Sequence, residues 1–180
     1  AASKMRVFMN QTAEDFAVLN FDDPTVAEAA GDLAATVVPF SIRQEVPGGV
    51  FVRNGEIISA LGGSEERVLG ANDLGIPGPH NLSNALAAIA AAGAVGLAAS
   101  DAAEVLSRFR PIEHRLEDVA LVRGVRYVND SKATNIDSVR CALESYEEPI
   151  VLIAGGKDKG ADFSVLRDLV AERVKRLVAI

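Results

Sequence analysis

Residues 126–154, RYVNDSKATNIDSVRCALESYEEPIVLIA, contain the pattern that decides the fold of this chain. Apolar strand-like runs alternate there with an amphipathic helical run, and the alternation continues to the end of the sequence. The predicted elements are a strand at 126–129, a helix at 135–145, a strand at 150–154, a helix from 164 to about 173 and a strand from 177. Strand, helix, strand, helix, strand is typical of a doubly wound α/β domain, whose ligands bind outside the carboxyl ends of parallel strands.

A cluster of polar side chains follows the first of these strands. The turn NDSKATN, residues 129–135, brings a carboxylate, an amine and two hydroxyls to the place where an α/β sheet exposes its functional groups. Asp130 could hold a ribose hydroxyl or Mg²⁺, Lys132 could neutralise a phosphate, and Thr134 could bind a substrate carboxylate. An ordinary polar turn, with Asn135 as the cap of the next helix, is the alternative.

A glycine-rich loop, GGKDKG at residues 155–160, follows the strand at 150–154. Its glycines would let a ligand approach the backbone, and a lysine would supply a point charge for an anion. It is not a Walker A loop, because the spacing G-x-x-x-x-G-K-[ST] occurs nowhere in the 180 residues. We expect this loop and the turn around Asp130 to leave neighbouring parallel strands and to converge with a helix tip at Asn81 and Asn84 on one cleft for nucleotide and amino acid.

The preceding residues are predicted to form a separate domain with its boundary at Pro111, which gives domains of residues 1–110 and 111–180. An antiparallel hairpin is predicted at 49–61, because Asn54-Gly55 accepts the positive φ angles of a tight turn. The other expected elements are the end of a helix at 1–8, strands at 16–20 and 36–40, a helix at 25–30, a long helix from Asn81, and a helix capped by Asp101 that ends near Phe109.

Two further groups of residues are candidates for ligand binding. Asn81 and Asn84 lie three apart on one helical face, at a helix start where free N–H groups and the positive dipole end suit a base, ribose or phosphate. Asn81 acting only as a helix cap is the alternative. Arg115, in EHRLE at residues 113–117, could contact a phosphate or a carboxylate, or could belong to a solvated charge run in a domain linker.

The composition excludes several classes of protein. With a net charge of −7 and no cluster of Lys or Arg, the chain lacks the basic surface that nucleic acid requires. No segment reaches the ~20 apolar residues of a membrane span, and the single cysteine cannot form an intrachain disulfide. Zinc-type Cys/His spacings and a G-x-S-x-G elbow are absent. We therefore expect a cytoplasmic α/β protein without a nucleic-acid or membrane partner.

The order of four motifs resembles the Mur ligase family. They are GPHNLSNALAA from residue 78, HRLE from 114, NDSKATN from 129 and GGKDKGADFS from 155, and the resemblance spans nearly the whole chain. DSKATN in particular is similar to the branch of the family that adds D-glutamate. The resemblance implies the end of a central P-loop-type ATPase domain, followed by part of a Rossmann-like C-terminal domain with a mainly parallel sheet. The family's amino-terminal domain and phosphate loop would lie upstream, and the sequence stops in a predicted strand, so we expect the 180 residues alone to be inactive.

The resemblance also implies roles for individual residues. Those that match the family's ATP-binding positions are Asn81, Asn84, His114, Arg115 and Asp130. Thr134 and Lys159 match residues that bind the carboxylate of D-glutamate, and Lys132 matches a lysine near the phosphates. Lys4 matches a lysine that becomes a carbamate and binds Mg²⁺, with a plain surface amine as the alternative. Arg115, Lys132 and Lys4 would be the catalytic residues.

The implied reaction is an ATP-dependent, ADP-forming ligation in peptidoglycan synthesis. The carboxylate of UDP-N-acetylmuramoyl-L-alanine would take the γ-phosphoryl group of ATP, and the amine of D-glutamate would then displace phosphate, with Mg²⁺ and cationic side chains stabilising phosphoryl charge. The full-length enzyme would be a monomer whose second domain closes about the linker at 109–113. Two alternatives remain, namely another Mur-type or folylpolyglutamate-type ligase, and a non-catalytic Rossmann-like binding module.

Overall fold

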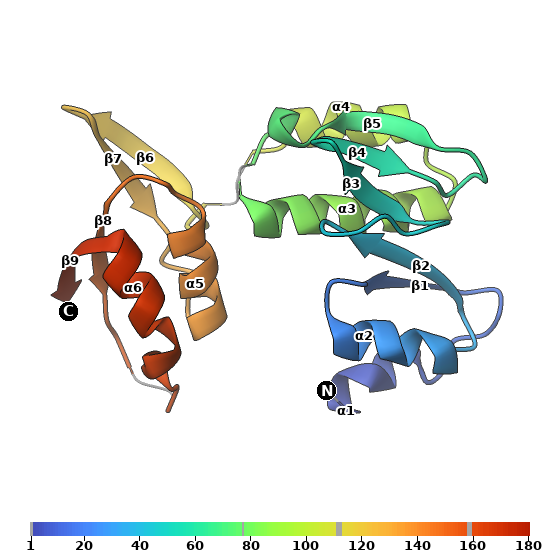
Figure 1. The fold of residues 1–180 in the computed structure, drawn as a ribbon, viewed down its shortest axis with the longest axis horizontal. Coiled ribbons are helices and arrows are strands. Elements are labelled where there is room, and N and C mark those ends of the chain that lie inside the picture. Colours follow the sequence, from blue (N-terminus) through green and yellow to red (C-terminus); the bar gives the residue numbers. More distant parts are fainter. Residues whose placement is uncertain (1, 77, 111–112, 158–159) are drawn as a thin grey trace. The chain divides into compact units, whose positions relative to one another are not determined.

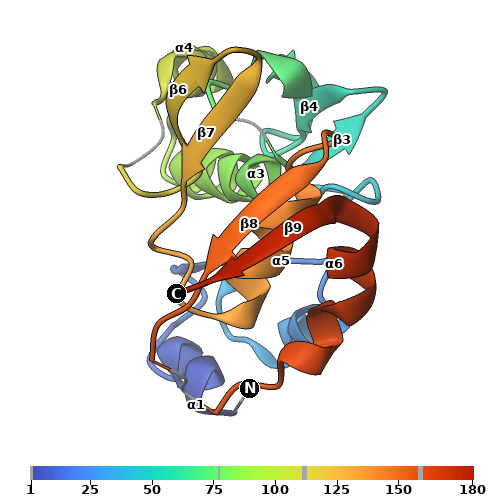
Figure 2. The same cartoon turned by 90° about the vertical axis from the view of Figure 1, so that its left-hand side faces the viewer.

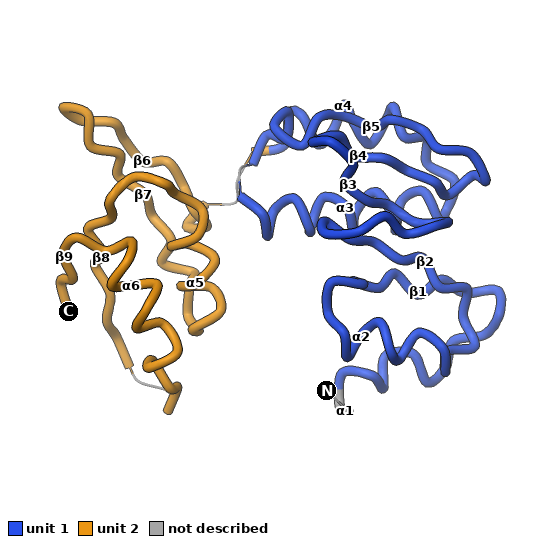
Figure 3. Tube along the Cα trace, in the orientation of Figure 1, with its two compact units in different colours: residues 1–109 blue, residues 110–180 orange. Residues whose placement is uncertain are grey.

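The computed structural model divides the chain into two compact units, Ala1–Phe109 and Arg110–Ile180 (Figure 3). It describes residues 2–76, 78–110, 113–157 and 160–180, apart from the side chains of Ala2 and Ser3. Pro111, the predicted boundary, lies outside the described residues and next to the division between the units. Each unit has its own strands and its own buried side chains.

Unit 1 is built on a five-stranded sheet in the order β1-β2-β3-β4-β5 (Figure 1). The first three strands are parallel to one another, whereas β3, β4 and β5 pair antiparallel. The elements of the unit, in chain order, are α1 (Ala2–Met5), η1 (Arg6–Phe8), β1 (Phe16–Asn20), α2 (Pro24–Ala29), η2 (Ala30–Asp32), β2 (Thr36–Ser41), β3 (Val50–Arg53), β4 (Glu56–Ser59), β5 (Glu66–Gly70), η3 (Ala71–Asp73), α3 (Pro79–Ala94) and α4 (Ala99–Arg108). The predicted mixed α/β architecture is confirmed.

Successive side chains of β1 and β2 pack on opposite faces of this sheet, as the two-residue period of a strand requires. Ala17 and Leu19 belong to a small cluster that also contains Val26 of α2. Val18 and Val38 belong instead to a larger cluster on the face that α3 and α4 cover. The sheet is therefore sandwiched between short helices on one side and two longer helices on the other.

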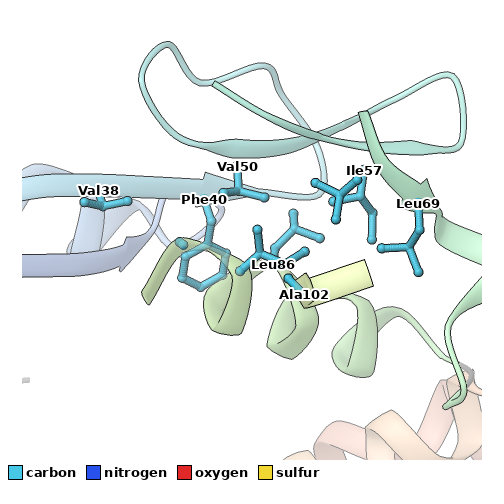
Figure 4. Close-up of a cluster of buried hydrophobic side chains, with 10 residues drawn as sticks. Val38, Phe40, Val50, Ile57, Leu69, Leu86 and Ala102 are labelled. Atoms are coloured by element: carbon cyan, nitrogen blue, oxygen red, sulfur yellow. The ribbon is translucent and has the colours of Figure 1, made fainter. Parts of the chain in front are cut away.

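The larger cluster is the main core of unit 1 (Figure 4). Leu86 points from α3 toward the sheet, where Phe40 and Val50 face it, and its side chain is fully buried. Ala102 brings α4 into the same cluster. The buried alanines at 85 and 90 let α3 approach the strands closely, which explains why so alanine-rich a helix packs here.

The predicted hairpin is confirmed, with β3 and β4 joined by Asn54 and Gly55, whose φ angles are 52° and 78°. These two left-handed residues are what a tight hairpin turn requires. Beside the turn, Arg53 donates hydrogen bonds to Glu45 and Glu65, and its guanidinium lies 5.1 Å from the centre of the Phe51 ring. Arg53 therefore ties two loops to the hairpin.

The pKa values of Glu45 and Glu65 are both lowered, first by the hydrogen bonds from Arg53. A carboxyl group whose folded pKa is depressed stabilises the fold above its unfolded pKa of about 4.3, and that contribution is lost as the pH falls through the folded value. The free energy of unfolding in urea should therefore differ between the wild type and the double variant Glu45→Gln/Glu65→Gln at pH 7, and this separation should be smaller at pH 3, below the unfolded pKa of about 4.3. An equal separation at both pH values would contradict this, and Glu14→Gln, outside the cluster, is the control.

Three predictions for unit 1 were wrong or incomplete. Asp101 does not cap α4, because the capping position is Ala98 and Asp101 lies in the first helical turn. There its carboxylate faces the positive end of the helix dipole, which is an alternative use of an acidic residue at a helix start. Asn81 is not the cap of α3 either, since that helix is capped by Gly78 and begins at Pro79. Strand β5 was not predicted at all.

Unit 2 has two two-stranded sheets, one antiparallel and one parallel. Its elements are β6 (Glu117–Val122), β7 (Val125–Asn129), α5 (Ile136–Glu144), β8 (Ile150–Ala154), η4 (Phe163–Leu166), α6 (Arg167–Arg173) and β9 (Val174–Ala179). Figures 1 and 2 show α5 and α6 together on one face of the β8–β9 sheet, and Leu143 and Leu166 are the buried side chains of this layer. Val151 and Ile153, on the opposite face, are exposed.

The predicted succession of strands and helices in unit 2 is confirmed, but one predicted pairing is not. Strands β8 and β9 pair in parallel, and α6 belongs to the connection between them, as parallel pairing of consecutive strands requires. Strand β7 pairs antiparallel with β6, and within the described residues it has no ladder with β8. The loops after Asn129 and Ala154 thus do not leave hydrogen-bonded neighbours of one parallel sheet.

Among the helices that the structure describes, none is long and apolar enough to cross a membrane.

Candidate functional site

Two turns of unit 2 meet at the open end of the β6–β7 hairpin, where Glu117 pairs with Asn129. The backbone N–H of Leu116 donates a hydrogen bond to Oδ1 of Asp130 at 3.2 Å. The backbone N–H of Lys132 donates to the carbonyl of His114 at 3.1 Å. The structure thus brings together the HRLE and NDSK sequences, which lie more than ten residues apart in the chain.

The side chains of Glu117, Asn129 and His114 form a compact polar group within this site. Oε2 of Glu117 accepts hydrogen bonds from the backbone N–H of His114 at 2.8 Å and from Nδ2 of Asn129 at 3.2 Å. Nδ2 of Asn129 also lies 2.8 Å from Nδ1 of His114. The His114 ring is half exposed and the Glu117 carboxylate is partly buried, so the group presents the ring to solvent.

The backbone of the 113–117 turn is held in an uncommon conformation. His114 and Leu116 have φ angles of 68° and 42°, in the left-handed region that costs an L-residue roughly 1–2 kcal/mol. The backbone N–H groups of both residues donate to carboxylates, of Glu117 and Asp130 respectively. Unfavourable backbone angles that neighbouring groups hold in place concentrate at ligand-binding sites, which supports this turn as a binding element.

Charged and polar side chains surround the two turns. Arg115 and Lys132 are exposed and supply positive charge, and Thr134 offers an exposed hydroxyl. Asn135 accepts a hydrogen bond from the backbone N–H of Ser138 at 2.8 Å, which confirms it as the cap of α5. The cations and the Asp130 carboxylate together could hold a phosphorylated ligand that also presents hydroxyl groups.

Tyr146, in the loop after α5, reports on the electrostatics near this site. Its pKa is raised, first by burial and then by the carboxylate of Asp118, with a smaller contribution from Asp130. A phenol with a raised pKa stays protonated in neutral and mildly alkaline solution. Tyr146 is therefore a neutral neighbour of the charged groups, not an additional anion.

The predicted nucleotide-binding residues of unit 1 lie at the beginning of α3. Asn81 is the third residue of that helix and is half-buried, and Asn84 is exposed one turn further on. Gly78, at the capping position, has a φ of 102°, which glycine adopts readily. Lys4 is exposed on the four-residue helix α1. Asn81 and Asn84 therefore share one helix start, while Lys4 belongs to a separate element.

Two further predictions concern the contact of Lys159 with D-glutamate and the binding of Mg²⁺. Lys159 lies outside the described residues, so its predicted contact with D-glutamate stays a prediction. Gly156 and Gly160, on either side of it, have φ angles of 114° and 74°. In the part of the chain that the structure describes, no group of three or more His, Cys, Asp or Glu side chains is arranged to hold a metal ion. The role of Lys4 in binding Mg²⁺ therefore stays a prediction that rests on the resemblance to the family.

A comparison with protein-family models matches residues 1–92 to the Mur ligase middle domain. The chain belongs to the Mur ligase family. Relatives named UDP-N-acetylmuramoylalanine–D-glutamate ligase include a protein from Pelotomaculum thermopropionicum, 52% identical over 100% of this chain, and one from Clostridioides difficile, 44% identical over 99%. This Mur ligase chain spans 40% and 39% of the length of these two relatives.

Solved Mur ligase structures resemble this fold. MurF from Acinetobacter baumannii superposes with a TM-score of 0.73 at 21% identity, over 99% of this chain and 41% of that one. A pseudomurein peptide ligase type C from Methanothermus fervidus gives 0.62 at 18% identity, over 91% of this chain and 45% of that one. At these identities the likeness establishes the fold and nothing finer.

Sequence reasoning gave no role to Glu117 and Asn129, although both lie inside motifs that were noted. Each was passed over because its neighbours, Arg115 and Asp130, have more obvious ligand chemistry. The signal that could have found them is the hairpin itself, because two strands joined at Arg123-Gly124 must bring residues near 117 and 129 into register. Their hydrogen bonds to His114 make them part of the site.

Proposed function

We propose that this chain is part of an ATP-dependent, ADP-forming ligase that adds D-glutamate to UDP-N-acetylmuramoylalanine in peptidoglycan synthesis. The observation that supports it most is the meeting of the HRLE and DSKATN sequences around Asp130 in unit 2. Relatives that are 52% and 44% identical to this chain, over 100% and 99% of its length, are named as ligases of UDP-N-acetylmuramoylalanine and D-glutamate. Residues 1–110 would be the end of the central ATP-binding domain and residues 111–180 the beginning of the ligase domain.

In the proposed reaction the substrate carboxylate oxygen bonds to the γ-phosphorus of ATP and ADP leaves. The amine of D-glutamate then attacks the acyl phosphate, loses a proton and displaces inorganic phosphate, which closes the amide bond. Little covalent chemistry falls to the protein, so its residues act by positioning and by stabilising phosphoryl charge. Arg115 and Lys132 would supply the positive charge, and Thr134 and Lys159 would hold the carboxylate of D-glutamate.

Each unit has its own proposed nucleotide-binding residues. Asn81 and Asn84 would bind the adenine end, and Asp130 would accept hydrogen bonds from the ribose hydroxyls, as a carboxylate can. His114 and Arg115 would contact the phosphate end. Mg²⁺, with Lys4 as a carbamate among its ligands, would neutralise phosphate charge when bound.

The full-length enzyme and a panel of amino acids test this proposal. With ATP, Mg²⁺ and UDP-N-acetylmuramoyl-L-alanine, release of phosphate should depend on D-glutamate and should fall to background with L-alanine, meso-diaminopimelate or L-glutamate. A preference for another amino acid would favour a different Mur-type or folylpolyglutamate-type ligase. No nucleotide-dependent rise in melting temperature of the full-length protein, together with no turnover, would favour a non-catalytic module.

The same proposal predicts the type of substrate, the cellular location and the oligomeric state of the full-length enzyme. Its substrates are small molecules, and we expect the full-length protein to act in the cytoplasm as a monomer. The 180 residues alone should give no turnover above background, because no Walker A spacing occurs in them. Turnover by the isolated chain would contradict that expectation.

A further inference from the structure

The orientation of the Asn129 amide can be deduced from its partners. Oδ1 of Asn129 accepts a hydrogen bond from the backbone N–H of Ser131 at 3.1 Å, and a backbone N–H is only a donor. Nδ2 lies 3.2 Å from Oε2 of Glu117, and a carboxylate oxygen is only an acceptor. Exchanging the oxygen and nitrogen of the amide would place donor against donor and acceptor against acceptor. The amide is therefore fixed in one orientation.

The fixed amide decides the protonation of the His114 ring. Nδ2 of Asn129, which can only donate, lies 2.8 Å from Nδ1 of His114. Nδ1 also lies 3.5 Å from Oε2 of Glu117, but its much shorter contact is with the Asn129 donor. Nδ1 is therefore the accepting nitrogen, and in the neutral ring the proton resides on Nε2. We propose that Asn129 and Glu117 are positioning residues that hold His114 in its Nε2–H tautomer, so that Nε2 can donate a hydrogen bond to a phosphate oxygen of the bound nucleotide.

Glu117 supports the arrangement from two sides. The same oxygen, Oε2, accepts from Nδ2 of Asn129 and from the backbone N–H of His114, so it fixes the amide and the backbone of the histidine together. His114 has its φ at 68°, and the hydrogen bond to Glu117 helps to retain that conformation. Partners that orient a histidine through its second nitrogen are known to fix both the tautomer and the direction of the ring.

The strand register brings these groups together. Glu117 pairs with Asn129 across the hairpin, and an irregularity between Asp118 and Ala120 shifts the register by one residue. With the regular register of the hairpin tip, Asn129 would face Asp118 instead. A bulge that redirects side chains is common beside functional sites. The contact between Glu117 and Asn129 therefore depends on this irregularity.

The inference rests on the proposed function only for the ligand of His114, because the tautomer can be measured without any ligand. The 180 residues contain two histidines, His80 and His114. In the full-length protein, a His114→Gln variant identifies the His114 signals by their disappearance. In ¹⁵N-labelled full-length protein, long-range ¹⁵N–¹H correlation spectra above the titration range of the ring should show His114 protonated on Nε2. Protonation on Nδ1 in the wild type would overturn the proposal without the need for any variant.

Three variants separate positioning from a general structural role. Asn129→Asp replaces the donor by an acceptor and should switch His114 to the Nδ1–H tautomer, whereas Glu117→Gln keeps an accepting oxygen and should leave Nε2–H in place. Asn135→Asp adds the same charge at the cap of α5, where the side chain accepts from the backbone of Ser138, and is the matched control. An unchanged tautomer in folded Asn129→Asp would also overturn the proposal.

Nucleotide affinity connects the tautomer to function. By calorimetry with ADP, Asn129→Asp in the full-length protein should bind about tenfold more weakly, which corresponds to about 1.4 kcal/mol, while Asn135→Asp should bind within about twofold of the wild type. Full ADP affinity in a variant whose tautomer has switched would overturn the role of Nε2. If the wild type shows Nε2–H but binds no ADP, the tautomer assignment stands and the proposed nucleotide site fails.

Discussion

Replacing Asp130 by alanine should lower kcat/KM of the full-length ligase by about a hundredfold or more. The carboxylate has two uses, since Oδ1 accepts the backbone N–H of Leu116 and the remaining acceptor capacity would bind the ribose hydroxyls. Each hydrogen bond to a charged group contributes about 1.5–3 kcal/mol, so the loss of the bonds from two ribose hydroxyls alone corresponds to at least about a hundredfold. Steady-state kinetics with ATP as the varied substrate measure the effect, which should include a raised KM for ATP.

Two variants make this prediction specific. Asp130→Asn retains an oxygen that can accept from Leu116, so it should preserve the turn and lose only the charge, with an intermediate effect. Asp118→Ala removes an exposed carboxylate of β6 that pairs with Arg126, and should change kcat/KM less than about threefold, because exposed ion pairs contribute little. An Asp130→Ala enzyme as active as Asp118→Ala would exclude Asp130 from the nucleotide site.

Local patterns predicted most of the fold because several elements have their own strong signals. Asn54-Gly55 specified the hairpin turn by its tolerance of positive φ, and the strand Phe16–Asn20 was recognised as a short apolar run. Strand β5 was missed because its first two residues, Glu66 and Arg67, are charged and exposed, so its apolar part is too short to be distinguished. Its pairing with β4 is a tertiary interaction that sequence periodicity does not encode.

The candidate site could be predicted only in part, for a related reason. Asp130 and Lys132 follow strand β7, and that position alone made them candidates. The contact of Asn129 with His114 depends on the irregularity near Asp118. A shift of one residue moves every following side chain to the other face of a strand, so no local pattern could have selected Glu117 over Asp118.

Helix α3 connects the stability of unit 1 with the proposed nucleotide site, since Leu86 lies on the same helix as Asn81 and Asn84. Leu86→Ala should lower the free energy of unfolding by about 3 kcal/mol, within the range of 2–5 kcal/mol typical for leucine truncations in a close-packed core. The cause is a cavity between α3 and the sheet, beneath Phe40 and Val50, where Leu86 is fully buried. Urea unfolding followed by circular dichroism measures it.

Leu97→Ala, in the loop after α3, is the matched control because the same atoms are removed from a side chain that is 47% exposed. It should cost less than about 1 kcal/mol, since truncation of a half-exposed side chain leaves no enclosed cavity. An equal loss of unfolding free energy in the two variants would show that the buried face of α3 does not contribute more to stability than the exposed Leu97. If Leu86→Ala also weakens ADP binding while Leu97→Ala does not, the start of α3 is held in place by the core beneath it, and the asparagines there owe their position to packing one turn away.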